Sequence, residues 1–139
     1  MTLKSRGQLR GCIGRVQPGG PLIQLVGTLA LDSAFRDKRF KPVAAAELGH
    51  LDVEVSVLTP LATIPGPDAI QTGRDGVVLI VGDRSAVFLP QVATEQGWTR
   101  TELLDNLAQK AGLPAGAWRE KRAKLLTFRA DVFDESILK

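Results

Sequence analysis

Two pairs of side chains in this sequence have the types and spacing that chemistry requires. Arg10 lies two residues before Cys12, and Glu54 lies two residues before Ser56. In an extended strand, residues two apart project from the same face, so each pair is expected to share one face. A guanidinium close to a thiol favours the thiolate, which is the form that attacks electrophiles and takes part in redox chemistry. These four residues are the predicted catalytic group, in a cleft where Glu54 can form an ion pair with Arg10.

The residues around Cys12 are also candidates for ligand contact. Gly11 and Gly14 flank this cysteine, which is the only one in the chain. Because glycine has no side chain, another backbone or a ligand can come close at these two positions. Lys110 is a further candidate binding residue, although a lysine in the last turn of a predicted helix also stabilises the helix dipole.

Structural interpretations stand beside these functional ones. Cys12 is either a reactive or ligand-contacting thiol or a small apolar residue packed in a tight strand, and the exposure of its sulfur distinguishes the two. An ion pair between Glu54 and Arg10 either positions a substrate or only satisfies two buried charges. Trp98 and Trp118 fit core anchors better than base-stacking platforms, since tryptophan buries a large apolar area.

Known cofactor motifs give no further guidance. A zinc site usually takes about four ligands from Cys and His, and this chain has one of each, Cys12 and His50. The glycine-rich motifs of nucleotide-binding proteins and the serine motif of hydrolases do not occur. The sequence therefore predicts no metal site, leaves the cofactor unspecified, and does not decide whether the protein is an enzyme.

The composition is that of an ordinary globular protein. The chain has 139 residues, 44% of them hydrophobic and 24% charged, with a net charge of +3. This length fits one domain, and no apolar run approaches the roughly 18 residues of a membrane span. The first six residues lack the apolar stretch of a secretory signal, and one cysteine cannot form an internal disulfide. We therefore expect a cytoplasmic protein without a membrane segment.

Hydrophobic periodicity predicts an α+β fold with a central antiparallel sheet and flanking helices. Strands are expected at residues 2–4, 9–16, 51–57, 77–81, 85–89 and 126–132, with two hairpins among them. Helices are expected from Pro21 to near Asp37, from Pro42 to Gly49, from Pro90 to Gly97, and from a Thr99–Glu102 capping box to Gly112. The proline-rich loop 59–72 is expected to separate two lobes.

The segment Leu9–Gly14, read Leu-Arg-Gly-Cys-Ile-Gly, resembles the signature hexapeptide of the AMMECR family, also called AmmeMemoRadiSam system protein A. We call Leu9–Gly14 the signature segment. Further blocks follow in that family's order and extend the resemblance over nearly the whole chain: 33–37, Arg39-Phe40, 54–58, 88–93, Gly97-Trp98, 110–113, and Trp118 before Phe128.

The resemblance carries several implications. The family has an α+β fold with a larger and a smaller lobe, and its biochemical activity is not established. Its members are encoded beside, or fused to, Memo-like and radical S-adenosylmethionine proteins, which implies a shared modification or redox pathway. Members usually carry several dozen residues before the strand that corresponds to 2–5, so residues 1–139 resemble a single AMMECR-type domain that is shortened at its N-terminus. We therefore expect exposed apolar surface near Leu3 that a partner chain covers, as in a homo-oligomer.

Two other functions remain open. A protein-interaction module would present a large apolar surface patch in place of a pocket. A nucleic-acid-binding protein would bring together the basic segments 36–41 and 119–124, although each also contains an acidic residue.

Overall fold

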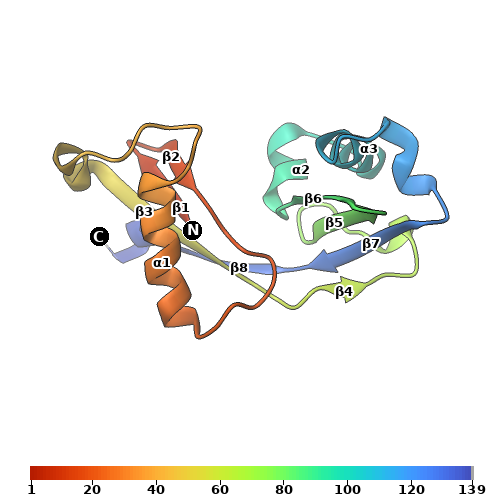
Figure 1. The fold of residues 1–139 in the computed structure, drawn as a ribbon, viewed down its shortest axis with the longest axis horizontal. Coiled ribbons are helices and arrows are strands. Elements are labelled where there is room, and N and C mark those ends of the chain that lie inside the picture. Colours follow the sequence, from red (N-terminus) through yellow and green to blue (C-terminus); the bar gives the residue numbers. More distant parts are fainter. Residues whose placement is uncertain (139) are drawn as a thin grey trace. The chain divides into compact units, whose positions relative to one another are not determined.

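The computed structural model describes residues 1–138, which form strands with helices between some of them (Figure 1). In chain order the main elements are β1 (Thr2–Ser5), β2 (Gln8–Cys12), α1 (Leu22–Phe35), β3 (Leu51–Leu58), β4 (Ala62–Thr63), β5 (Gly76–Val81), β6 (Arg84–Phe88), α2 (Gln91–Gln96), α3 (Arg100–Lys110), β7 (Ala123–Phe128) and β8 (Ala130–Asp134). Short 3₁₀ helices cover Ala45–His50, Pro67–Ala69, Ala115–Arg119 and Glu135–Leu138.

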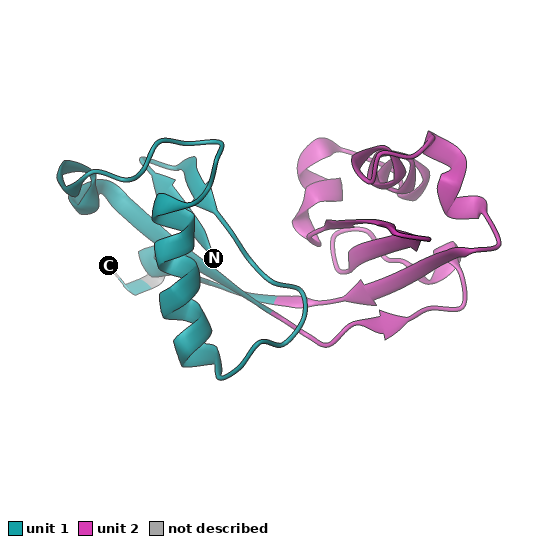
Figure 2. Ribbon diagram, in the orientation of Figure 1, with its two compact units in different colours: residues 1–57, 131–139 teal, residues 58–130 magenta. Residues whose placement is uncertain are grey.

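The strands form two four-stranded antiparallel sheets, in the orders β2-β1-β3-β8 and β4-β7-β5-β6. This confirms the predicted α+β class, with the strands divided between two sheets. The chain separates into two compact units, one of residues 1–57 and 131–139 and one of residues 58–130 (Figure 2). We call these unit 1 and unit 2. The expectation that 1–139 form one domain stays a prediction.

Unit 1 packs α1 against β1 and β2. A two-residue turn, Arg6-Gly7, joins the two strands, and both residues have positive φ angles of 51° and 78°. These angles belong to the type I′ turn, whose twist matches that of the flanking strands. The predicted first hairpin and first helix are confirmed, with α1 ending at Phe35.

Strand β2 is shorter and less regular than predicted. It ends at Cys12 instead of Val16, so Gly14 lies in the loop that follows. The proline and glycine residues of 18–21 favour this loop over a longer strand. The pairing also contains a β-bulge, because Leu3 is opposite Gly11 while Lys4 is opposite Leu9. Arg10 is therefore the extra residue, and the simple alternation along β2 is interrupted there.

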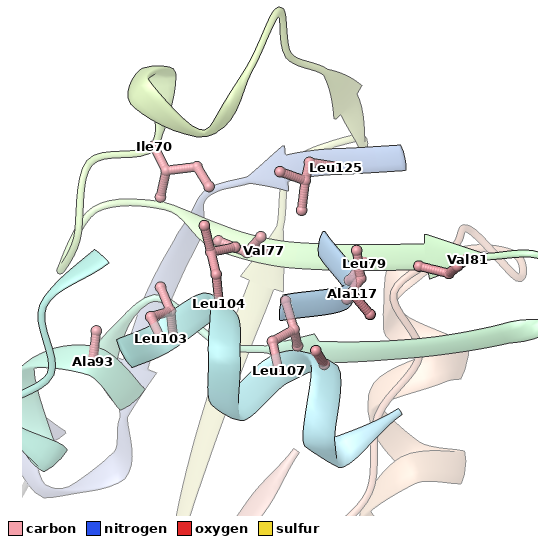
Figure 3. Packing of buried hydrophobic residues seen from close by; sticks show 11 residues of the cluster. Ile70, Val77, Leu79, Val81, Ala93, Leu103, Leu104, Leu107, Ala117 and Leu125 are labelled. Carbon is pink, nitrogen blue, oxygen red and sulfur yellow. The ribbon is translucent and has the colours of Figure 1, made fainter. Parts of the chain in front are cut away.

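Unit 2 places α3 over the sheet formed by β4 to β7. Leu103, Leu104 and Leu107 of α3 are at most 2% exposed and point toward Val77 and Leu79 of β5 (Figure 3). The predicted capping box is present: the Thr99 hydroxyl accepts from the Glu102 amide, and the Glu102 carboxylate accepts from the Thr99 amide. Trp98 and Trp118 pack against this core, as predicted.

The last predicted strand, 126–132, is two strands in different sheets. β7 ends at Phe128 and pairs with β5, whereas β8 begins at Ala130 and joins the sheet of unit 1. The predicted core face is right at Phe128, which is 2% exposed, but Leu125 from the other face joins the buried cluster and Val132 is 50% exposed. A continuous alternation of apolar and polar residues does not reveal where a chain leaves one sheet for another.

Two smaller predictions are corrected. The helix expected from Pro42 to Gly49 is a 3₁₀ helix, Ala45–His50, and the Ala44 amide at its start donates to the Glu47 carboxylate. The loop 59–72 contains the short strand β4, which pairs with β7.

No helix among residues 1–138 combines the length and apolar character needed to span a membrane.

Gly76 provides a test of packing in unit 2. It lies opposite Phe128 across the β5–β7 pair, and a Cβ added at this glycine would overlap the Phe128 ring. We expect Gly76→Ala to lower the free energy of unfolding by about 1–3 kcal/mol, because the buried ring must move. Urea denaturation measures this change. Gly66→Ala is the matched control, since a Cβ there meets nothing within 4 Å, and an equal loss in both variants would contradict the packing argument.

Candidate functional site

The signature segment lies directly against the backbone of α1. Gly11 is buried, and a Cβ at this position would overlap the carbonyl oxygen of Ser33. The absence of a side chain at Gly11 therefore allows the backbone of α1, and not a ligand, to approach closely. Gly14 differs, because it is exposed and a Cβ there would meet nothing within 4 Å.

Two side chains near the end of α1 hold the backbone of the signature segment. The Cys12 amide donates to the Asp37 carboxylate at 2.9 Å, and the Ile13 amide donates to the Ser33 hydroxyl at 3.0 Å. The Ser33 hydroxyl in turn donates to the carbonyl oxygen of Met1 at 3.1 Å. These contacts give the buried Ser33 and Asp37 side chains partners and fix the strand end that carries the cysteine.

Asp37 is held in its charged form. The Arg39 guanidinium donates to both of its oxygens, at 3.0 and 2.8 Å. This hydrogen bonding, supported by the amides of Cys12 and Arg39, keeps the pKa of Asp37 well below its usual range although burial opposes the shift. Asp37 and, to a lesser degree, Cys12 raise the pKa of Arg39.

The Cys12 side chain is half-buried. Its sulfur accepts a hydrogen bond from the Thr2 hydroxyl at 3.4 Å, and its carbonyl oxygen accepts from Arg39 at 3.3 Å. The arginine that contacts Cys12 is thus Arg39 and not the predicted Arg10. Cys12 is partly and not fully buried, and the choice between a reactive thiol and a residue packed in a tight strand stays open.

Arg10 belongs to a different part of unit 1. Its guanidinium donates to the two oxygens of Glu47 at 2.7 and 3.1 Å, and to the carbonyl oxygens of Lys41 and Pro42 at 2.9 and 3.4 Å. The predicted Arg10–Glu54 ion pair is therefore wrong. The bulge at Arg10 explains the error, because it breaks the alternation that would have placed the guanidinium beside Cys12.

Glu54 lies on the same sheet face as Cys12. Thr2 is opposite Cys12 on one side and opposite Glu54 on the other, so these three side chains share a face. Lys4, two residues after Thr2, donates to Glu54 at 2.6 Å. We call Thr2, Lys4, Cys12 and Glu54 the Cys12 face. Alternation along β3 places Ser56 on it as well.

Lys110 belongs to unit 2, whereas the other candidate residues belong to unit 1. It is the last residue of α3, which agrees with its predicted position in the final helical turn. Its ammonium donates to the carbonyl oxygen of Val87 at 2.8 Å and lies 4.6 Å from the centroid of the Phe88 ring. These contacts anchor α3 to β6, and a binding role for Lys110 stays a prediction.

The residues that sequence reasoning missed are Thr2, Asp37, Arg39 and Glu47. Asp37 and Arg39 belong to the basic segment 36–41, in which a single acidic residue did not stand out as a binding partner. The sequence did contain one signal for this ion pair: Asp37 lies at the end of a predicted helix, two residues before Arg39. No group of three or more His, Cys, Asp or Glu able to hold a metal ion occurs among residues 1–138.

An apolar groove lies on the α1 side of this sheet. It has a volume of about 540 Å³, and Leu3 is one of its lining residues. Leu3 itself is only 4% exposed, so its burial requires no partner chain. Nearby, Leu31, Phe35 and Leu48 also line the groove and are 53–65% exposed. The expected apolar surface is therefore present, and its covering by a partner chain stays a prediction.

The sequence matches the AMMECR1 family model over residues 1–133, and the chain belongs to this family. A relative from Methanothermobacter thermautotrophicus is 42% identical over 141 residues, which cover 97% of this chain and 73% of that protein. Protein PH0010 from Pyrococcus horikoshii is 43% identical over 132 residues, covering 91% of this chain and 64% of its own length.

The fold agrees with a solved structure of the same family. The crystal structure of the uncharacterized protein PH0010 aligns with a TM-score of 0.89 and 40% identity, covering 96% of this chain and 70% of the other. The predicted family and fold class are thereby confirmed.

The Arg10–Glu47 pair predicts a pH dependence of stability. Hydrogen bonds from Arg10 lower the pKa of Glu47 to about 2, below its ordinary value of 4.5. A carboxylate whose pKa is lower in the folded state stabilises the fold above its unfolded pKa, and this contribution is lost as the pH falls toward 2. We therefore expect wild type to exceed Glu47→Gln in stability near neutral pH, with the difference shrinking between pH 4.5 and 2.

Urea denaturation of both proteins across this pH range measures the difference. Glu95→Gln removes an exposed carboxylate on α2 and serves as the control, with little change in stability expected. A difference between wild type and Glu47→Gln that stays constant over the range would contradict the ion pair.

Proposed function

We propose that this AMMECR1-family protein is a catalytic or accessory component of a pathway shared with Memo-like and radical S-adenosylmethionine proteins. The Cys12 face is the part that contacts the pathway's substrate. The observation that carries this proposal is the partly buried Cys12, whose sulfur accepts from the Thr2 hydroxyl and beside which the Arg39 guanidinium lies.

The surroundings of Cys12 suit a thiol that engages a ligand. The Thr2 hydroxyl and the Arg39 guanidinium are both hydrogen-bond donors at Cys12, and reactive cysteines occur in partly exposed positions with such polar neighbours. Lys4 and Glu54 add a donor and an acceptor on the same face, with side chains 33% and 15% exposed.

The pathway assignment rests on kinship. The signature segment resembles that of AmmeMemoRadiSam system protein A, and the chain belongs to the AMMECR1 family. The chain corresponds to about two thirds of the length of several relatives, so the activity of the longer proteins need not reside in this part alone. An accessory role, in which the Cys12 face presents or receives a group, is therefore included in the proposal.

A protein-interaction module is the second candidate, and one observation favours it. α1 exposes Leu22, Ile23, Leu31 and Phe35, with Ile23 80% exposed. Exposed apolar side chains concentrated on one helix are characteristic of protein-binding surfaces. A helix that binds a pathway partner is compatible with substrate contact at the Cys12 face, because α1 lies on the opposite side of the sheet.

Nucleic-acid binding receives no comparable support. In the segment 36–41, Arg36 pairs with Asp32 and Arg39 pairs with Asp37. In the segment 119–124, Arg122 pairs with Glu120. Neighbouring carboxylates thus neutralise much of the charge that phosphate binding would use.

Alkylation of Cys12 by iodoacetamide at neutral pH tests the substrate-contacting thiol. We expect wild type to react faster than a peptide of residues 9–14, because the Thr2 hydroxyl donates to the sulfur and the Arg39 guanidinium lies beside Cys12. Arg39→Gln and Thr2→Val should each slow the reaction several-fold. Intact-mass spectrometry over time provides the rates, and circular dichroism shows that each variant is folded.

Arg36→Gln is the matched control, since Arg36 is an exposed arginine of the same segment that pairs with Asp32. It should leave the rate unchanged. Wild-type alkylation no faster than that of the peptide would overturn the reactive-thiol proposal, as would equal rates in wild type and Arg39→Gln.

A further inference from the structure

A second pocket lies beside the β1–β2 turn, apart from the contacts of the Cys12 sulfur. It has a volume of about 630 Å³, within the range of pockets that hold small molecules. Residues of the turn, the signature segment and the 3₁₀ helix Ala45–His50 line it: Ser5, Arg6, Gln8, Leu9, Arg10, Ala46, Glu47 and His50. We call it the turn pocket. All of its walls belong to unit 1.

Arg6 occupies an unfavourable backbone conformation at the rim of this pocket. Its φ is 51°, and it is the only residue other than glycine with a positive φ among residues 1–138. Asparagine followed by glycine is the preferred sequence for a type I′ turn, whereas arginine pays a steric cost in the left-handed region. Such costs concentrate at binding sites, where the side chain has a role that outweighs the strain.

The charges of the turn pocket are unbalanced. The Glu47 carboxylate is occupied by Arg10 and by the Ala44 amide. The Arg6 guanidinium forms no ion pair or hydrogen bond with any residue in 1–138, and neither does the His50 ring. Two arginines and one glutamate leave one net positive charge with His50 neutral. The free charge is that of Arg6, and it matches a ligand with a single negative charge.

The remaining walls define the rest of the ligand. Ala46 offers an apolar surface in this pocket. Leu9 also lines it, but its side chain is opposite Lys4 in the hairpin and shares the face of Lys4. Ser5 and Gln8 lie on either side of the turn and are opposite each other in the register of the hairpin. Their side chains can hydrogen-bond to polar atoms of a ligand.

We propose that the turn pocket binds a small carboxylic acid, with the carboxylate on Arg6 and the body of the ligand against Ala46. A planar guanidinium pairs with a carboxylate through two parallel hydrogen bonds, which supplies both strength and orientation. The Arg10–Glu47 pair forms a rigid wall beside this site. This binding activity is independent of the Cys12 face and extends the function proposed above.

Benzoate, benzamide and phenyl phosphate are the probes, added to the 15N-labelled protein and followed by amide chemical shifts. Benzoate should shift the amides of Arg6, Gln8 and His50 in a saturable manner. Benzamide has the same shape without the charge, and should bind at least about tenfold more weakly. Phenyl phosphate tests whether the site prefers a doubly charged ligand.

Arg6→Asn is the decisive variant, because it separates the structural and functional roles of this residue. Asparagine-glycine suits the turn, so the melting temperature should rise or stay the same, while the affinity for benzoate falls by about tenfold or more. Arg15→Asn removes an exposed arginine outside the pocket and should leave the affinity unchanged.

Three results would overturn the proposal. Equal affinity for benzoate and benzamide would show that the charge of Arg6 is not used. Retention of benzoate binding by a folded Arg6→Asn protein would show that another residue holds the ligand. Much tighter binding of phenyl phosphate than of benzoate would replace the carboxylic acid with a phosphate ester as the ligand class.

Discussion

The close approach of Gly11 to the backbone of Ser33 is the constraint on which unit 1 depends. Any side chain at position 11 would separate β2 from α1, because the space is filled by a carbonyl group that cannot rotate away. This approach brings the amides of Cys12 and Ile13 within hydrogen-bonding distance of Asp37 and Ser33. The glycine of the signature segment is thus explained by packing, and the packing positions the cysteine.

The bulge at Arg10 divides the signature segment into two functional parts. On one side of it, Cys12 joins Thr2, Lys4 and Glu54 on a sheet face. On the other, Arg10 turns toward Glu47 and forms a wall of the turn pocket. A regular strand would have placed both side chains on one face, so a single irregular residue gives this short segment two separate surroundings.

Much of the fold could be predicted from the sequence, since local rules govern most of its elements. The apolar repeat of α1, the capping box of α3 and the hairpin of β5 and β6 depend on neighbouring residues, and all are confirmed. The division between β7 and β8 could not be predicted, because it depends on which distant strand each half pairs with. The limits of β2 and the 3₁₀ helix at Ala45–His50 likewise depend on long-range contacts.

The candidate site was predicted less completely for the same reason. The common face of Cys12 and Glu54 follows from alternation within their own strands and from the register through Thr2. The partner of Arg10 depends on a bulge, which has no local signal in the sequence apart from the nearby glycine. The cation beside Cys12 is Arg39, 27 residues away in sequence, and only the path of the chain after α1 brings it there.

Equilibrium urea unfolding of Gly11→Ala and Gly14→Ala tests the central constraint most directly. The two glycines lie on either side of Ile13 and Cys12, and neither has a positive φ, so they differ mainly in what surrounds them. We predict that Gly11→Ala lowers the free energy of unfolding by about 1–3 kcal/mol or more, while Gly14→Ala changes it by less than about 0.5 kcal/mol. Equal stability of the two variants would contradict the account, because β2 would then not depend on close contact with α1.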